Sequence, residues 1–314
     1  MTDQNDASPK ATIENGGLGL LTCSMATDLP LFELLARSVD DHVDPRIMHH
    51  VVVPAADLPR FRAFANDRRE IVAQEDVLPE RLRKLPAWLR HFSFLQAGLR
   101  RPIYLRPDRS VVRGWMLQQF LKIEMSRRIE AAAVMHVDSD VAFFRRLAPE
   151  DAFAGDRVRF FRVEGKPINP MHDAWVAGSC RFLGISPPAR HDVHYIENCV
   201  LWSRAVARAM VDRMQEAQGK PLQDILFSAE TMSEYYVYGI FADLCPEAAE
   251  LAAEEVSFCN SYWPSEETGA VDFDALRSHL VPKHCAIAVQ STHDFTLADR
   301  ARLYETASRT MATA

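Results

Sequence analysis

Two aspartates that close an apolar run are the residues of this chain whose type and spacing best suit chemistry. The segment Ala131–Val141, AAAVMHVDSDV, is small and apolar until Asp138-Ser139-Asp140. Such a run predicts a buried strand that delivers its acids to the carboxyl edge of a parallel sheet, where open α/β sheets bind ligands. On a continuing strand, residues two apart point to the same face, so the two carboxylates are expected to lie close together.

Two carboxylates held close together repel each other unless a proton or a cation lies between them. Oxygen ligands of this kind suit Mg2+ or Mn2+ rather than Zn2+. Such a metal commonly holds a diphosphate, so Asp138 and Asp140 indicate a nucleotide-activated substrate. The spacing by itself is common, and a solvated turn after a strand is the alternative explanation.

Polar residues elsewhere in the chain could complete such a site. Gln118, Gln119 and Lys122 precede the acidic strand by about one helix. A lysine there could neutralise a phosphate and a glutamine could hydrogen-bond a sugar or base, and a solvated helix face is the alternative. Glu197 and Asn198 lead into an apolar segment, where they could bind sugar hydroxyls or cap a helix or turn.

Glu234 and His293 are the remaining candidates. Glu234 lies among aromatic residues in SEYYVYG, where burial would raise its pKa and suit a general base or a sugar-binding carboxylate. The alternative is a first-turn residue of a helix that Ser233 caps. His293 follows a late strand-like run and could be a third metal ligand, although lone histidines are more often structural. The competing histidines are His172, His191 and His194.

The elements that must position these residues alternate between strands and helices. Strand-like runs cover residues 18–23, 47–53, 70–73, 131–141, 158–163 and 286–290. Helical patterns cover residues 29–39, 57–66, 113–129, 204–218, 230–244 and 296–308. Strand, helix and strand within about 35 residues predict a βαβ unit, so we expect an α/β fold with a mainly parallel sheet.

Length and charge narrow the class of protein. A chain of 314 residues can bury a substantial core, and we expect a disordered leader over residues 1–17 and one domain over residues 18–314. The net charge of -7 argues against a nucleic-acid partner. No apolar run reaches the ~18 residues of a membrane span, so the protein is expected to be cytoplasmic, with any membrane association peripheral. Six scattered cysteines are expected to be reduced thiols.

Taken in order, these motifs resemble a known family. The segments are LLTCS with Asp28 soon after it, GWMLQQFLKI, HVDSDVAF, ENCVLWS, SEYYVYGIF and VQSTHD. The chain resembles a bacterial family of uncharacterised proteins regarded as glycosyltransferases with the GT-A fold. It is more distantly similar to the glycogenin and lipopolysaccharide galactosyltransferase type. The resemblance runs from about residue 17 to about residue 294.

The resemblance implies a Rossmann-like GT-A fold, with a mixed, mostly parallel central sheet flanked by helices. A nucleotide-sugar donor, by default a uridine diphosphate sugar, would bind at the carboxyl edge of the sheet. Asp138 and Asp140 would hold Mn2+ or Mg2+ on the donor diphosphate, with His293 in the position of a third ligand. Thr22 and Asp28 would lie beside the nucleotide.

The resemblance also places the acceptor, a glycan or other hydroxyl compound, near Glu234, Glu197 and Asn198. Lys122 and the metal would stabilise the departing nucleoside diphosphate. Glu234 would deprotonate the acceptor if the reaction inverts, whereas a retaining reaction needs no dedicated base. One departure is that the H-x-x-G-x-x-K ending of the glycogenin type is absent, because Thr296-Leu297-Ala298 follows His293 instead.

Three other functions are compatible with parts of this pattern. A haloacid-dehalogenase-type phosphatase would carry Thr or Val where this chain has Ala142. A sugar nucleotidyltransferase would carry a glycine-rich phosphate loop, and Thr22–Thr27 contains no glycine. A carbohydrate-binding protein on a GT-A shell without turnover is the third. The predicted function is a metal-dependent glycosyltransferase.

Overall fold

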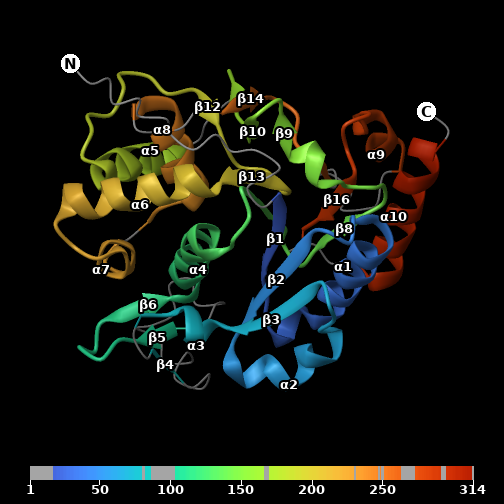
Figure 1. Cartoon of the computed structure of the whole chain (residues 1–314), viewed down its shortest axis with the longest axis horizontal. Helices are drawn as coiled ribbons and strands as arrows, with labels where there is room; N and C mark the ends of the chain where they lie inside the picture. The colour runs from blue at the N-terminus through green and yellow to red at the C-terminus, as the bar shows by residue number, and fades with distance from the viewer. Residues whose placement is uncertain are drawn as a thin grey trace, which may run out of the picture.

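The central sheet has five strands in the order β13-β7-β1-β2-β3 (Figure 1). Strands β7, β1, β2 and β3 run parallel to one another, and the edge strand β13 runs antiparallel to β7. The strands are β1 (Leu18–Cys23), β2 (Met48–Val53), β3 (Arg69–Ala73), β7 (Ala133–His136) and β13 (Val200–Ser203). The computed structural model describes residues 17–79, 82–85, 103–165, 170–229, 231–246, 248, 251–262, 273–290 and 295–312. The predicted α/β class and the mixed, mostly parallel sheet are confirmed.

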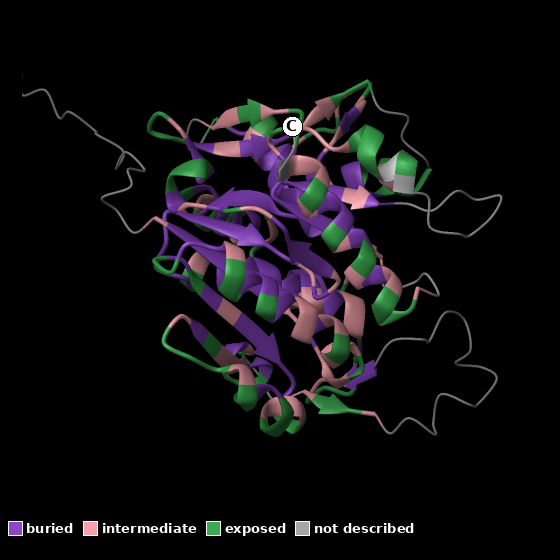
Figure 2. Ribbon diagram, turned by 90° about the vertical axis from the view of Figure 1, so that its right-hand side faces the viewer, coloured by how far each residue is buried: buried purple, intermediate pink, exposed green. Residues whose placement is uncertain are grey.

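Helices cover both faces of this sheet, and its strands are buried throughout most of their length (Figure 2). Alternate residues of β1 face opposite sides: Leu20 packs in the cluster that includes α1, and Leu21 in the cluster that includes α4. Strands covered on both faces read as continuous apolar runs, as the sequence of β7 does. Helix α1 (Leu29–His42) lies on one side and α4 (Gly114–Arg128) on the other. Further helices pack on the α4 side, partly against one another: α5 (Pro170–Leu183), α6 (Arg204–Gln218), α7 (Leu222–Phe227) and α8 (Glu234–Leu244).

A second, separate sheet has the strand order β15-β16-β8, and the chain enters it directly after β7 of the first sheet. Its strand β8 begins immediately after Asp140, and Leu303 of the C-terminal helix packs against Ile287 and Val289. The elements here are β8 (Val141–Phe143), β15 (Cys259–Tyr262), β16 (Ala286–Val289), α9 (Phe273–His279) and α10 (Leu297–Ala312). The remaining short elements are α2 (Leu58–Phe61), α3 (Gln74–Val77), β4 (Arg83–Lys84), β5 (Ile103–Leu105), β6 (Val111–Arg113), β9 (Phe153–Ala154), β10 (Arg157–Phe161), β11 (Val163–Glu164), β12 (Val193–His194) and β14 (Ala252–Glu254).

The predicted strand over residues 131–141 is wrong in one respect that matters for the site. Strand β7 ends at His136, and Asp138–Asp140 forms a turn, which the bond from the Val141 amide to the Asp138 carbonyl closes at 3.2 Å. The chain then enters the second sheet as β8. The predicted helix over 57–66 is also only partly helical, with α-helix at 58–61 and 3-10 turns on either side. Residues 1–16 of the predicted leader lie outside the described residues.

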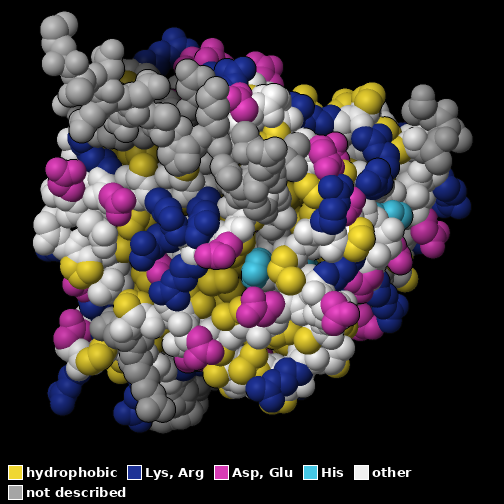
Figure 3. Space-filling model, viewed as in Figure 1, with side chains coloured by type: hydrophobic (Ala, Val, Ile, Leu, Met, Phe, Trp, Pro, Cys, Tyr) yellow, Lys and Arg dark blue, Asp and Glu magenta, His cyan; other side chains and the backbone are white. Residues whose placement is uncertain are grey.

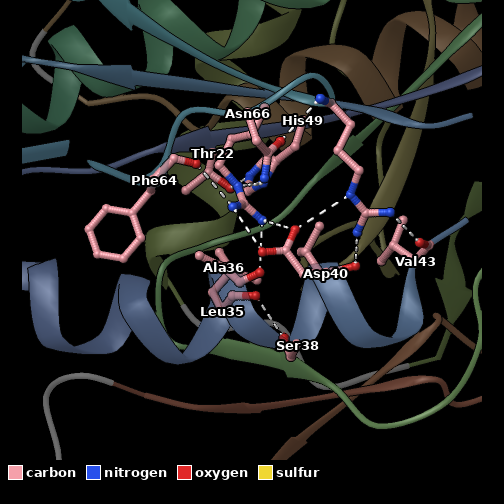
Figure 4. A network of polar contacts seen from close by, with 12 residues as sticks. Thr22, Leu35, Ala36, Ser38, Asp40, Val43, His49, Phe64 and Asn66 are labelled. Carbon is pink, nitrogen blue, oxygen red and sulfur yellow. Dashed lines mark hydrogen bonds and ion pairs between the residues drawn. The ribbon is translucent and has the colours of Figure 1, made fainter. Parts of the chain in front are cut away.

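A buried polar network fixes the carboxyl end of β1 to α1 (Figure 4). The Arg69 guanidinium donates to His49 Nδ1 at 3.2 Å, so His49 carries its proton on Nε2 and donates it to Thr22 Oγ1 at 2.9 Å. Arg69 is 2% exposed and also donates to the Ala36 carbonyl at 2.7 Å and to Asp40 at 3.0 Å. These bonds satisfy polar groups that would otherwise be buried without partners.

Two fully buried histidines predict that acid destabilises the fold. Burial lowers the pKa of His49 and His136 well below the ordinary value of 6.5, and Arg69 and Lys122 respectively lower it further. Below pH 6.5 the unfolded chain therefore binds protons that the folded chain does not. We expect each ring to reduce the free energy of unfolding by up to about 1.4 kcal/mol per pH unit as the pH falls below its unfolded pKa.

Urea unfolding at about pH 7 and about pH 5.5 measures this effect. His136→Gln lacks one of the titrating rings and should show a smaller difference between the two pH values. An equal pH dependence in the variant and the parent protein would contradict the assignment of His136 as a neutral buried ring.

Candidate functional site

A cavity of about 500 Å³ opens at the carboxyl ends of the parallel strands. Each of the four parallel strands contributes a residue at or just beyond its end, because parallel strands finish at the same edge. These residues are Cys23 at the end of β1 and Ser24 after it, Pro54 after β2, Gln74 after β3, and Asp138, Ser139 and Asp140 after β7. The α4 face that closes the cavity presents Gly114, Leu117, Gln118 and Leu121.

Two hydrogen bonds fix the turn that carries the two aspartates. The Ser139 hydroxyl donates to Ser24 Oγ at 2.8 Å, which joins the ends of β7 and β1. The Asp140 carbonyl accepts from the Val289 amide at 3.2 Å, which ties the turn to β16. Both aspartates line the cavity, and they do so from a turn rather than from a continuing strand.

Lys122 joins Asp138 to α8 at the back of the cavity. Its ammonium nitrogen lies 3.1 Å from Asp138 Oδ1, 3.3 Å from Glu234 Oε1 and 3.0 Å from the Tyr235 hydroxyl. The Lys122 side chain is 5% exposed, that of Glu234 7% and that of Asp138 40%. Asp138 is therefore the member of this group that faces the cavity, and the other charges are buried behind it.

The charges of this group determine its protonation. Burial alone would lower the pKa of Lys122, but the charges of Asp138, Tyr235 and Glu234 raise it well above its ordinary value. Burial raises the pKa of Glu234, and Lys122 partly offsets that rise. Burial likewise raises the pKa of the nearby Cys23 thiol to about 12, so Cys23 is uncharged. Lys122 thus provides a fixed positive charge.

Asn198 lines the cavity on the side towards β15, whereas Glu197, predicted as a catalytic residue, lies behind Asn198 and outside this lining. The Asn198 amide group donates to Ser261 Oγ at 3.1 Å, and the Asn198 side chain lines the cavity. Glu197 accepts from the Asn198 backbone amide at 2.8 Å and from the Ser261 hydroxyl. Cys199 follows with a φ of +55°, and this left-handed residue turns the chain into β13.

Three predicted binding residues do not line the cavity: Lys122 is buried behind Asp138, and the neighbours of Thr22 and Gln119 line the cavity in their place. Thr22 faces α1 and bonds to His49, whereas Cys23 faces the cavity, because successive strand residues point to opposite faces. Gln119 is buried with its amide nitrogen 3.8 Å from the Met116 sulfur, whereas Gln118 lines the cavity. Asp28 lines the cavity as well. His293 lies outside the described residues.

Tyr235 is a residue of the site that the sequence interpretation missed as a functional group. Its hydroxyl contacts Lys122, and the Lys122 ammonium lies 5.0 Å from the centroid of its ring. The sequence feature that could have identified Tyr235 is its position next to Glu234 at the start of a helix. Gln74, Tyr104 and Gln290 were also missed and line the cavity.

The residues present fit a hard divalent cation that its substrate helps to coordinate. Among the described residues, no three His, Cys, Asp or Glu side chains are grouped so as to hold a metal by themselves. Asp138 Oδ1 is paired with Lys122, but the Asp138 side chain is 40% exposed and lines the cavity together with Asp140. Mg2+ is commonly bound through one or two carboxylates together with substrate phosphates. Asp138 and Asp140 would supply those carboxylates.

One group of basic side chains on the surface lies at the end of α4 that is remote from this cavity. Figure 3 shows a group of Lys and Arg side chains over α4 and α6. Arg127 and Arg128 lie at the end of α4 opposite to Gly114, and both pair with the buried Glu124. Arg208 donates to the Arg127 carbonyl at 3.0 Å. Because it lies at that remote end of α4, this group adds no charge to the described lining.

The structure is an α/β protein with a cavity at the carboxyl edge of its parallel strands, and Asp28, Asp138 and Asp140 line that cavity. The chain belongs to the family of unknown function DUF6492, whose profile matches residues 19–303. The match extends from β1 into α10, so the region that the family shares includes both sheets. A comparison with curated proteins gave no match. In the part of the chain that is described, no helix has the length and apolar character of a membrane span.

Proposed function

We propose that the protein is a metal-dependent glycosyltransferase of GT-A type. It would transfer a sugar from a nucleotide diphosphate sugar, by default a uridine diphosphate sugar, to a hydroxyl of a glycan or other acceptor. The observation that carries the proposal is the pair Asp138 and Asp140 on the wall of a cavity at the carboxyl edge of parallel strands, with Lys122 buried behind Asp138. The resemblance of the sequence to GT-A glycosyltransferases supports the same function.

Mn2+ or Mg2+, held by Asp138 and Asp140, would neutralise the diphosphate and polarise its oxygens. The cavity lining holds no Lys or Arg among the described residues, so Lys122 is the cation of the chain placed to support the departing diphosphate. Lys122 is paired with both Asp138 and Glu234, so its part would be to offset the charge of Asp138 next to the diphosphate, while the metal would supply the net positive charge. Apolar lining residues such as Leu117 and Leu121 would exclude water, which would otherwise compete as acceptor.

Glu234 is better suited to positioning Lys122 than to accepting a proton from the acceptor. Its carboxylate is ion-paired with Lys122 at 3.3 Å and does not belong to the lining of the cavity. The proposal therefore gives Glu234 a positioning role. Of the carboxylates in the described lining, Asp138 and Asp140 would hold the metal and Asp28 would lie beside the nucleotide, so none of them is assigned as a base. This arrangement favours a retaining reaction over an inverting one.

A thermal-shift titration with uridine, guanosine and cytidine diphosphates, each with and without Mn2+, tests the donor site. We expect one nucleotide to stabilise the protein only when Mn2+ is present, by about 2.7 kcal/mol at a concentration of about 100 times its Kd. The nucleotide that does so identifies the base of the donor. Stabilisation by none of the three would contradict the proposal, and so would binding that is independent of the metal.

A further inference from the structure

A second cavity, of about 490 Å³, lies on the α4 side of the central sheet, towards the amino ends of β1 and β2. The last turn of α4 and the short helix α3 form its walls, and hydrophobic side chains lie at the surface between α4 and the sheet (Figure 3). Its apolar lining includes Leu18, Met48, Val72, Val77, Met125 and Ile129. No residue of this lining belongs to the first cavity. An apolar cavity of roughly 300–1,000 Å³ with a few polar groups is typical of small-ligand sites.

A histidine and a glutamate on neighbouring strands form a pair in this lining. His50 of β2 and Glu70 of β3 are partners in the strand register, and both line the cavity. His50 Nδ1 lies 3.1 Å from Glu70 Oε2, and a carboxylate only accepts, so Nδ1 carries the proton. Burial lowers the pKa of His50 below its ordinary value of 6.5, although Glu70 partly offsets this effect. At pH 7 the ring is therefore neutral, and its Nε2 is a hydrogen-bond acceptor.

The Nε2 lone pair of His50 is open to a ligand. In the described part of the chain Nε2 has no hydrogen-bond partner, and it is not one of the atoms that are buried without a partner, so solvent reaches it. The His50 side chain is 16% exposed and lies on the same face of β2 as Met48, which is 38% exposed. Both side chains line the cavity, so the exposed part of the ring faces it.

The other charged groups of the lining indicate the charge of the ligand. Its two cations already have partners: Arg46 pairs with Asp44 and Glu150, and Arg128 pairs with the buried Glu124. Of its three carboxylates, only one has a Lys or Arg partner among the described residues. The groups left for a ligand are therefore acceptors, and the unbalanced charge is negative. An ammonium group, which has donors and no acceptor, matches this set.

We propose that the second cavity binds a small apolar amine, whose ammonium group donates to His50 Nε2 beside Glu70 and whose hydrocarbon part packs on the apolar lining. A carboxylate or phosphate in the same place would face the lone pair of Nε2 and the charge of Glu70 without a donor. Among the described residues the pair has no third ligand that would make it a metal site. Amine binding here does not depend on the glycosyltransferase function, which makes no use of this cavity.

The test measures three probes by ligand-observed NMR: phenethylamine, phenethyl alcohol and phenylacetate, which share a phenyl group and differ in charge. His50→Leu removes the acceptor and leaves Glu70, whose side chain is 60% exposed, to water. Met48→Trp fills the rim of the cavity from an exposed position and keeps His50. Met171→Trp, at a side chain that is 54% exposed and outside this lining, is the matched control. Asp138→Asn alters the first cavity, which is also acidic, and leaves the second unchanged.

We expect phenethylamine to bind wild type, Met171→Trp and Asp138→Asn with the same Kd. Its Kd should rise about tenfold or more in His50→Leu and in Met48→Trp, as expected for the loss of one hydrogen bond to a charged group or of the space itself. The alcohol and the acid should bind wild type more weakly than the amine. Absence of amine binding, equal binding of amine and alcohol, or an equal Kd in all five proteins would overturn the proposal. Loss of binding in Asp138→Asn would also overturn it, because the amine would then occupy the first cavity.

Discussion

Replacement of Lys122 by methionine is expected to lower the free energy of unfolding by about 3–5 kcal/mol. The reason is that the Glu234 carboxylate, 7% exposed, would remain in the interior without its counter-charge. Asp138 would contribute less to the loss, because its side chain is 40% exposed and water can replace Lys122. Donor binding should fail in the same variant, since the buried positive charge behind the diphosphate is lost.

Urea unfolding of Lys122→Met and of the double variant Lys122→Met/Glu234→Gln separates these effects. The double variant has no buried unpaired charge and should recover at least half of the lost stability, although it should still bind donor poorly. In the single variant the pKa of Glu234 should rise further, so the destabilisation should diminish as the pH falls from about 7 towards that pKa. A loss below about 1 kcal/mol would show that Glu234 does not depend on Lys122.

Much of the fold was predictable because its elements have strong periodic patterns. Strand β1 and helix α6 have the predicted bounds, 18–23 and 204–218. The turn at Asp138–Asp140 was not predictable, because β7 ends where its pairing with β13 ends, beyond the pair of His136 with Val200. That pairing joins segments more than sixty residues apart in the sequence, and no local pattern reports it.

The site was predictable in its charged residues and not in their neighbours. The structure brings together Asp138, Lys122 and Glu234, which belong to a turn and two helices. Each of them is a charged residue within or beside an apolar segment of the sequence, and this feature identified it. Gln119 was preferred to Gln118 as the binding residue, but Gln118 lines the cavity. The sequence could not separate them because α4 is buried on nearly all sides, with Gln119, Glu124 and Ser126 in the interior. A polar stripe on such a helix does not mark its solvent face. The sequence likewise did not show whether Thr22 or Cys23 faces the cavity, because both faces of β1 are covered.

Replacement of Asp138 by asparagine is expected to reduce kcat/KM for sugar transfer by at least about 100-fold, the loss typical of removing one electrostatic group from a transition state. The amide would be a poor ligand for Mg2+ or Mn2+ in place of a carboxylate. The fold should persist, because Glu234 continues to balance Lys122 and the Asp138 side chain is 40% exposed. Nucleotide stabilisation with Mn2+ should disappear from the thermal-shift titration.

Asp76→Asn is the matched control, because Asp76 is an exposed aspartate that lines a different cavity, at the opposite edge of the sheet. It should retain wild-type transfer and nucleotide binding. Equal losses in the two variants would show that the effect of Asp138→Asn comes from net charge and not from its position. Full metal-dependent nucleotide affinity in Asp138→Asn would remove the observation on which the glycosyltransferase proposal depends, since the two carboxylates would then be no more than a polar turn.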